Sequence, residues 1–151
     1  MNLDDFVIIV CLIMSAFFSG MEIAFISCNR VFLEIEKNKK GLIAKILKYI
    51  TSNPSKFITS MLVGNNFCLV IYGIFMGDKI VQILFTNLKD SPLPLDILFI
   101  QTLISTFVIL ITAEFLPKVF FQLYANQMVK YFALPSSVFY TFFMPISLLI
   151  L

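Results

Sequence analysis

The sequence contains no histidine and no tryptophan, and it has only 3 cysteines. Without histidine, the usual zinc sites, haem ligation and histidine acid–base catalysis are disfavoured, and the cysteine spacing fits neither a zinc site nor a disulfide framework. Charge is scarce too: charged residues make up 13% of the chain, whereas a soluble domain carries about a quarter. These absences argue against a soluble enzyme, and they turn attention to the hydrophobic residues, which form 60% of the sequence.

The hydrophobic residues are concentrated in stretches long enough to cross a bilayer, for which a helix needs about 20 apolar residues. These stretches are Phe6–Phe25, Phe57–Met76, Ile97–Ala113 and Tyr131–Leu151. Each should be helical, because backbone groups in lipid must form their hydrogen bonds within the segment. The sequence therefore predicts an all-α integral membrane protein, in contact with the lipid bilayer.

The distribution of charge predicts the orientation of the chain. Residues 29–56 contain seven Lys and Arg against Glu34 and Glu36, whereas the N-terminus offers Asp4 and Asp5. Short loops rich in Lys and Arg stay in the cytoplasm. We therefore expect the N-terminus outside and the C-terminus in the cytoplasm, in the plasma membrane (the inner membrane of a bacterium). The acidic N-terminus also indicates a retained span, not a cleaved signal peptide.

The loop between the first two spans has its own pattern. Apolar residues recur at three- and four-residue spacing between lysines, namely Ile35, Leu42, Ile43, Ile46, Leu47 and Ile50. This pattern predicts an amphipathic cytoplasmic helical segment on the inner membrane surface. Pro54 is expected in the first turn of the second span, and "SPLPLD" (91–96) is expected to form the outer turn before the third.

The fourth apolar stretch is open to two interpretations. Hydropathy alone makes Tyr131–Leu151 a span, which would carry the C-terminus outside. Pro135 and Pro145 interrupt it, however, and they favour a proline-broken juxtamembrane helix in or dipping into the inner leaflet. The fold class expected is three transmembrane helices plus this broken helix. The apolar ending "SLLIL" suggests a fragment of a longer protein, with its soluble part in the cytoplasm.

Polar residues lie inside the predicted spans. "FFSGME" (17–22) brings Ser19 and Glu22 into the first, and "VGNNF" (63–67) brings Gly64, Asn65 and Asn66 into the second. The small residues of the first span recur every four positions, which allows another helix to approach closely. The asparagines have an alternative role, since each can simply bridge two helices by hydrogen bonding.

The third span ends in "TAEFLPK" (112–118). Pro117 has no N–H, so the carbonyl of Ala113, four residues earlier, loses its helical partner beside the Glu114 carboxylate. Carboxylate, carbonyl, hydroxyl and amide oxygens are the hard ligands that Mg²⁺ prefers. A structural ion pair with Lys118 is the alternative role for Glu114, and Glu22 has the alternatives of snorkelling or pairing with Lys118 or Arg30.

Taken together, these motifs resemble a known family. "SAFFSGMEIAF", "PSKFITSMLVGNN" and "AEFLPK", in this order and spacing, resemble the transmembrane (DUF21) domain of the CorC/CNNM magnesium transporters. The resemblance makes 1–151 one such domain. It implies a homodimer with three spans and a juxtamembrane helix. It also implies cytosolic CBS domains beyond residue 151, through which adenine nucleotide would bind, and often a small C-terminal domain.

The resemblance also implies a function and a site. The function is Mg²⁺ export, proposed to be coupled to Na⁺ entry, and the metal ligands would be Ser19, Asn65, the Ala113 carbonyl and the Glu114 carboxylate. Possible supporting residues are Glu22, Asn66, Gly64, Pro117 and Lys118. The chain departs from the family pattern at Met21, at Ala113 and at Leu69, where a small polar residue is usual.

The leading hypothesis is therefore a membrane domain that binds Mg²⁺ and alternates access between cytoplasm and exterior. The rival hypothesis is a non-transporting membrane scaffold that keeps the fold and serves a partner, which Leu69 favours. An intramembrane enzyme has little support, because no serine has an obvious base and Glu22 near Ser19 is a weak dyad. Nothing in the sequence indicates a nucleic-acid partner.

Overall fold

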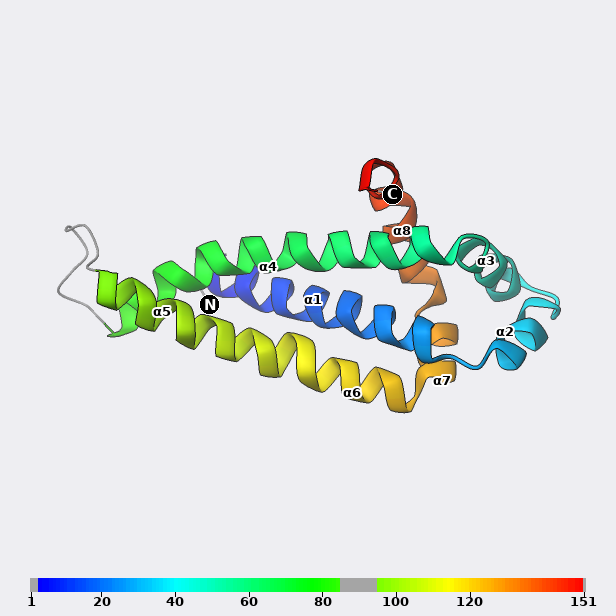
Figure 1. The fold of residues 1–151 in the computed structure, drawn as a ribbon, viewed down its shortest axis with the longest axis horizontal. Helices are drawn as coiled ribbons and strands as arrows, with labels where there is room; N and C mark the ends of the chain where they lie inside the picture. Colours follow the sequence, from blue (N-terminus) through cyan, green and yellow to red (C-terminus); the bar gives the residue numbers. More distant parts are fainter. Residues whose placement is uncertain (1–2, 85–94, 151) are drawn as a thin grey trace.

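The computed structural model describes residues 3–84 and 95–150, and in this part of the chain all regular structure is helical. Three long rods run side by side (Figure 1). They are α1 (Leu3–Ser27), α4 (Pro54–Leu84), and a continuous rod made of α5 (Leu95–Ile109), the π-helix η1 (Leu110–Phe115) and α6 (Leu116–Leu123). The helical and membrane character predicted from the sequence is confirmed.

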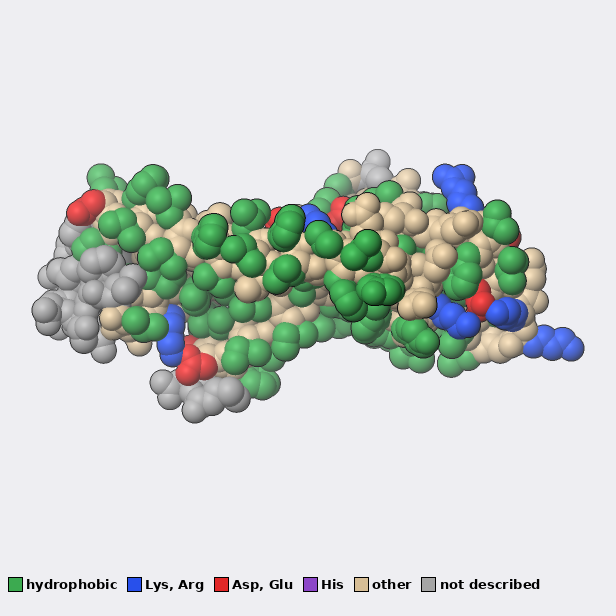
Figure 2. Space-filling model, turned by 90° about the horizontal axis from the view of Figure 1, so that it is seen from below, with side chains coloured by type: hydrophobic (Ala, Val, Ile, Leu, Met, Phe, Trp, Pro, Cys, Tyr) green, Lys and Arg blue, Asp and Glu red, His purple; other side chains and the backbone are tan. Residues whose placement is uncertain are grey.

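Four helical stretches of the described residues are long and apolar enough to cross a membrane, namely Leu3–Ser27, Pro54–Ile83, Leu95–Leu123 and Ala133–Ile150. The first three contain the predicted spans and extend them at both ends. Figure 2 shows apolar side chains over the long rods, with Lys and Arg gathered at the end of the molecule that holds α2 and α3. The rod Leu95–Leu123 is the least covered by protein, so most of its apolar side chains face outward.

The predicted amphipathic segment is two helices, α2 (Arg30–Lys37) and α3 (Leu42–Thr51). Asn29 caps α2 by accepting a hydrogen bond from the Val31 N–H over 2.8 Å. Gly41 lies between the helices with φ of 136°, a backbone conformation that favours glycine. The second span begins at Pro54, as predicted. Residues 91–94 of the expected "SPLPLD" turn lie outside the described residues.

The C-terminal stretch forms α7 (Ala125–Tyr131) and α8 (Ala133–Ile150). The prolines predicted a broken helix here. The structure places the interruption at Phe132, before Pro135, and α8 continues through Pro145. Figure 1 shows α8 crossing the long rods, not running beside them. This direction agrees with a helix lying along the membrane, although α8 also has the length and composition of a span.

A core of aromatic residues holds α1, α4 and α8 together. The Phe18 ring of α1 meets Phe139 and Phe143 of α8 edge to face, with ring centroids 5.0 and 5.9 Å apart. Gly64 of α4 allows the contact on the other side, because a Cβ there would stand 2.9 Å from the Phe18 ring. A second cluster around Ile8, Cys11 and Tyr72 closes the other half of the α1–α4 interface. The polar residues Ser15, Ser19 and Asn65 of this interface are buried.

Candidate functional site

Two serines of α1 lie at its buried interface with α4. Ser15 donates a hydrogen bond from Oγ to Oδ1 of Asn65 over 2.5 Å. Ser19, one turn further on the same face of α1, is fully buried, and its Oγ has no hydrogen-bond partner among the described residues. A buried hydroxyl without a partner is unusual in a folded protein. The interface therefore contains one satisfied amide oxygen and one hydroxyl available to a further ligand.

The third rod changes helical type where the sequence predicts a released carbonyl. In η1 the Leu116 N–H donates to the Ile111 carbonyl, five residues earlier instead of four. The Thr112 hydroxyl donates to the Val108 carbonyl over 2.6 Å, and Pro117 contributes no N–H at all. Ala113, at the centre of this turn, is completely buried, and η1 packs against α1. Such π-turns are frequent at functional sites.

Glu114 projects from the same turn and is partly exposed. Its Oε2 lies 3.9 Å from Nζ of Lys118, and the side chains are 30% and 43% exposed. This distance is at the outer limit of an ion pair, so Lys118 does not hold the carboxylate tightly. Glu22 of α1 lies within electrostatic range of both Lys118 and Glu114. Two carboxylates and one ammonium thus gather where η1 and α6 meet α1.

The remaining predicted residues divide into two groups. Gly64 and Pro117 act through packing, since Gly64 accommodates the Phe18 ring and Pro117 follows the widened turn. Asn66 is exposed on the outside of α4, away from its buried neighbour Asn65. Leu69 is half-buried one turn beyond Asn65. Of the two asparagines, only Asn65 is placed to bind a ligand at the α1–α4 interface.

The oxygens of this region are of a kind that suits a small hard cation. An amide oxygen and a hydroxyl lie at the α1–α4 interface, and the Glu114 carboxylate projects separately from η1. All three are oxygen ligands of the type that Mg²⁺ takes. Within the described residues no group of three or more His, Cys, Asp or Glu is placed to hold a metal ion. Any cation bound here would therefore rely largely on neutral oxygens. The buried Oγ of Ser19 is the observation that fits a missing ligand best.

Sequence reasoning missed Ser15, which counted only as one of several small residues in the first span. Its four-residue spacing from Ser19 was a usable signal, because this spacing puts both hydroxyls on one helix face. The buried polar residues in the half of the bundle away from α2 and α3 were missed as well. Tyr72 Oη and Gln101 Oε1 are buried without a hydrogen-bond partner in the described residues, and Lys79 forms an ion pair with Asp5 between α4 and α1.

Polar contacts fasten the basic end of the molecule. Glu36 is nearly buried and binds Lys39 of its own segment and Lys130 of α7, the latter over 3.1 Å. The hydrogen bond from Lys39, followed by that from Lys130, lowers the pKa of the Glu36 carboxyl. Burial raises the pKa of the Cys28 thiol to about 11, so it stays protonated and donates to Oδ1 of Asn126 over 3.1 Å. These contacts join the end of α1 and α2 to α7.

Two comparisons with known proteins show which family the chain resembles. A family model described as the cyclin M transmembrane N-terminal domain matches residues 6–151. UPF0053 protein sll0260 of Synechocystis sp. is 28% identical over 123 residues, which make up 78% of this chain and 27% of that protein. The chain thus spans little more than a quarter of the length of this curated relative.

Proposed function

The chain belongs to the family of cyclin M transmembrane N-terminal domains, and from this premise we propose that it binds Mg²⁺ inside the membrane and exports it. Membership of this family is compatible with a membrane domain that has a transport-related role. The proposed ligands are Ser19, Asn65, the Ala113 carbonyl and the Glu114 carboxylate. The observation that carries the proposal is the buried Ser19 hydroxyl without a partner, one turn from the Ser15–Asn65 hydrogen bond.

The chemistry of these groups explains why binding would be reversible. Mg²⁺ gives up water reluctantly and needs oxygens at about 2.0–2.1 Å in octahedral geometry. With Glu114 as the single ligand carboxylate, the occupied site keeps a positive charge, which favours release. Asn65 gives up its hydrogen bond from Ser15 to turn Oδ1 toward the ion. In the proposed cycle, Na⁺ entering the cell occupies the same oxygens after Mg²⁺ leaves.

Titration calorimetry of the purified chain with Mg²⁺ tests the site. The parent protein should release or absorb heat on binding, and Glu114→Ala should lose this signal. Glu34→Ala is the matched control, because Glu34 is an exposed carboxylate of α2 that pairs with Lys37. Equal binding heats in the parent and Glu114→Ala would exclude Glu114 from the site.

One position favours a second candidate function. Leu69 sits one turn after Asn65 on the same face of α4 and puts a branched apolar side chain where another oxygen ligand would help. A scaffold that keeps the fold and serves a partner protein would not need that ligand. Measurement of Mg²⁺ flux into or out of proteoliposomes separates the two functions. The parent protein moves Mg²⁺ if it is a transporter and moves none if it is a scaffold. Leu69→Asn should raise the flux if a missing ligand is what limits it.

Assembly and orientation are part of the proposal. The outward-facing apolar side chains of α5, among them Phe99, Leu103 and Phe107, suit a homodimer in the membrane. The lysines of α2 and α3 suit the cytoplasmic side, where CBS domains of the full-length protein would follow α8. Labelling of single cysteines introduced at Leu3 and at Lys40 tests this orientation. When a thiol reagent that does not cross the membrane is added to intact cells, only the cysteine at position 40 should be protected from labelling.

A further inference from the structure

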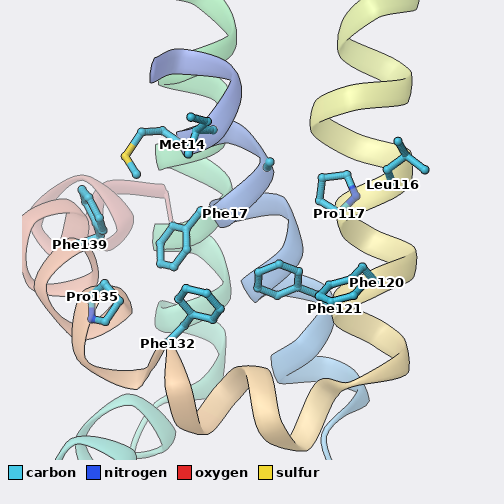
Figure 3. Close-up of a pocket in the computed structure, with 11 residues that line it drawn as sticks. Met14, Phe17, Leu116, Pro117, Phe120, Phe121, Phe132, Pro135 and Phe139 are labelled. Carbon is cyan, nitrogen blue, oxygen red and sulfur yellow. The ribbon is translucent and has the colours of Figure 1, made fainter. Parts of the chain in front are cut away.

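An apolar groove lies beside the proposed cation site, where α6 and α8 flank α1. Figure 3 shows α1 at the back of the groove, α6 and α8 as its walls and α7 below. Its volume is about 720 Å³. The Phe121 and Phe132 rings, stacked with centroids 5.5 Å apart, join the walls above α7. The groove is therefore closed toward α7 and open sideways between α6 and α8.

The groove lies at the depth of the hydrocarbon core. All its lining residues except Phe132 come from three stretches long and apolar enough to span a membrane, for example Phe17, Phe120 and Phe139. The exposed Tyr124 and Tyr131 stand just beyond it, at the two ends of α7. Tyrosines are enriched at the membrane–water interface. This places the groove just inside the interface on the side where α2 and α3 lie.

Only an apolar occupant fits such a space. Every lining side chain is apolar, and a stable water needs two to four polar partners. An empty space of this size would forfeit the dispersion contacts of its walls. Helices that pack in membranes use small residues to approach closely, whereas the rim of this groove carries bulky, exposed Ile13, Leu116 and Phe120. A thin, flexible chain fits better than a second helix.

We infer that the groove binds an acyl chain of a lipid from the leaflet next to α7. The wall formed by Leu116 and Pro117 directly follows η1, so the bound chain supports the turn that carries Ala113 and Glu114. Lipid in the groove thereby stabilises the geometry of the cation site. This second effect rests on the proposed function, whereas the binding of the acyl chain does not.

Fluorescence quenching tests the binding, because the chain has no tryptophan of its own. Three single-tryptophan variants of the full chain are placed in vesicles of phosphatidylcholine with brominated acyl chains. Phe139→Trp reports on the groove, while the neighbours Phe142→Trp (71% exposed) and Phe143→Trp (7% exposed) report on lipid and on the core. The groove tryptophan should be quenched as strongly as Phe142→Trp. Quenching as weak as that of Phe143→Trp would mean that protein fills the groove, and it would overturn the inference.

Filling the groove gives a second readout. Ala16 lines its back wall, so Ala16→Phe (or Ala16→Leu, if the larger side chain prevents folding) should at least halve quenching at position 139 and leave that at 142 unchanged. For the effect on the cation site, Mg²⁺ affinity is measured in delipidated detergent and after phosphatidylcholine is added back. The Mg²⁺ affinity of the parent should change at least twofold when lipid is added back, and that of the filled variant should stay the same. If lipid leaves the Mg²⁺ affinity of the parent unchanged, the support of η1 by the acyl chain is overturned, but the binding of the acyl chain is not. If the parent binds no Mg²⁺ at all, only the proposed function is contradicted.

Discussion

The Ser15 hydroxyl donates to Oδ1 of Asn65 across 2.5 Å, and so uses the amide oxygen that a cation between α1 and α4 would need. A cation that took the same lone pair of Oδ1 would compete with the Ser15 hydrogen bond. The bond also ties the two helices together in the absence of a cation. Ser15 is therefore a natural target for substitution.

Ser15→Ala should bind Mg²⁺ about threefold more tightly than the parent, because a hydrogen bond between membrane helices contributes about 0.6 kcal/mol on average. Titration calorimetry measures the affinity. Ser136→Ala is the matched control, since the buried Ser136 hydroxyl bonds the Phe132 carbonyl of its own segment and its loss should leave the affinity unchanged. Weaker binding in Ser15→Ala would instead make Ser15 itself a ligand.

Lys118→Gln should also tighten Mg²⁺ binding, by roughly two- to tenfold, because it removes a positive charge 3.9 Å from the Glu114 carboxylate. The effect should shrink with added salt, since Lys118 is 43% exposed. Lys45→Gln, at an exposed position of α3, controls for the change in net charge. If Lys118→Gln binds more weakly, the ammonium orients the carboxylate and does not compete with the ion.

Glu36 should make the stability of the chain depend on pH. Its folded pKa lies below the ordinary value of about 4.3, so the stabilisation is fully present above the ordinary value and is lost as the pH falls through the folded pKa. Thermal unfolding of the parent and Glu36→Gln should differ at neutral pH and converge in acid. Glu34→Gln, at the exposed neighbour that pairs with Lys37, should follow the parent at every pH. A constant gap between parent and Glu36→Gln would contradict the assignment.

Glycine substitutions should distinguish close helix contacts from open positions. A Cβ at Gly20 would stand 2.6 Å from Cγ of Phe121, so Gly20→Ala must displace the ring or α6 and should lower stability by about 1–3 kcal/mol. At Gly73 nothing lies within 4 Å of the added Cβ, so Gly73→Ala should be neutral or stabilising by up to about 1 kcal/mol. Thermal unfolding in one lipid or detergent measures both. Equal melting temperatures would mean that α6 does not pack against α1 as closely as described.

Much of the fold could be predicted because its elements depend on local sequence. Pro54 begins α4 as expected, and the spans follow from runs of apolar residues that leave the helix as the form available in lipid. The missing N–H of Pro117 also indicated where the third rod departs from α-helical geometry, and η1 ends two residues before it. The widening of that turn into a π-helix did not follow from the proline alone.

The partners of the polar residues could not be predicted. Asn65 and Asn66 are neighbours with the same side chain, yet one is buried against Ser15 and the other is exposed, because α1 covers only one face of α4. The apolar groove is likewise a product of three helices that meet around α1. The convergence of Glu114 with Ser19 and Asn65 on one cation stays a prediction, which the Mg²⁺ titrations address.

Local sequence is enough to predict a helical membrane protein, the residues within its spans and the oxygens available there. These properties depend on hydrophobic length, on backbone hydrogen bonding within each segment and on the missing N–H of one proline. Helix packing in three dimensions adds the hydrogen bond from Ser15 to the Asn65 oxygen and the groove between α6 and α8. It also leaves the Ser19 hydroxyl without a partner among the described residues. Contacts between segments depend on how helices rotate and cross, and packing sets those angles for the whole bundle at once.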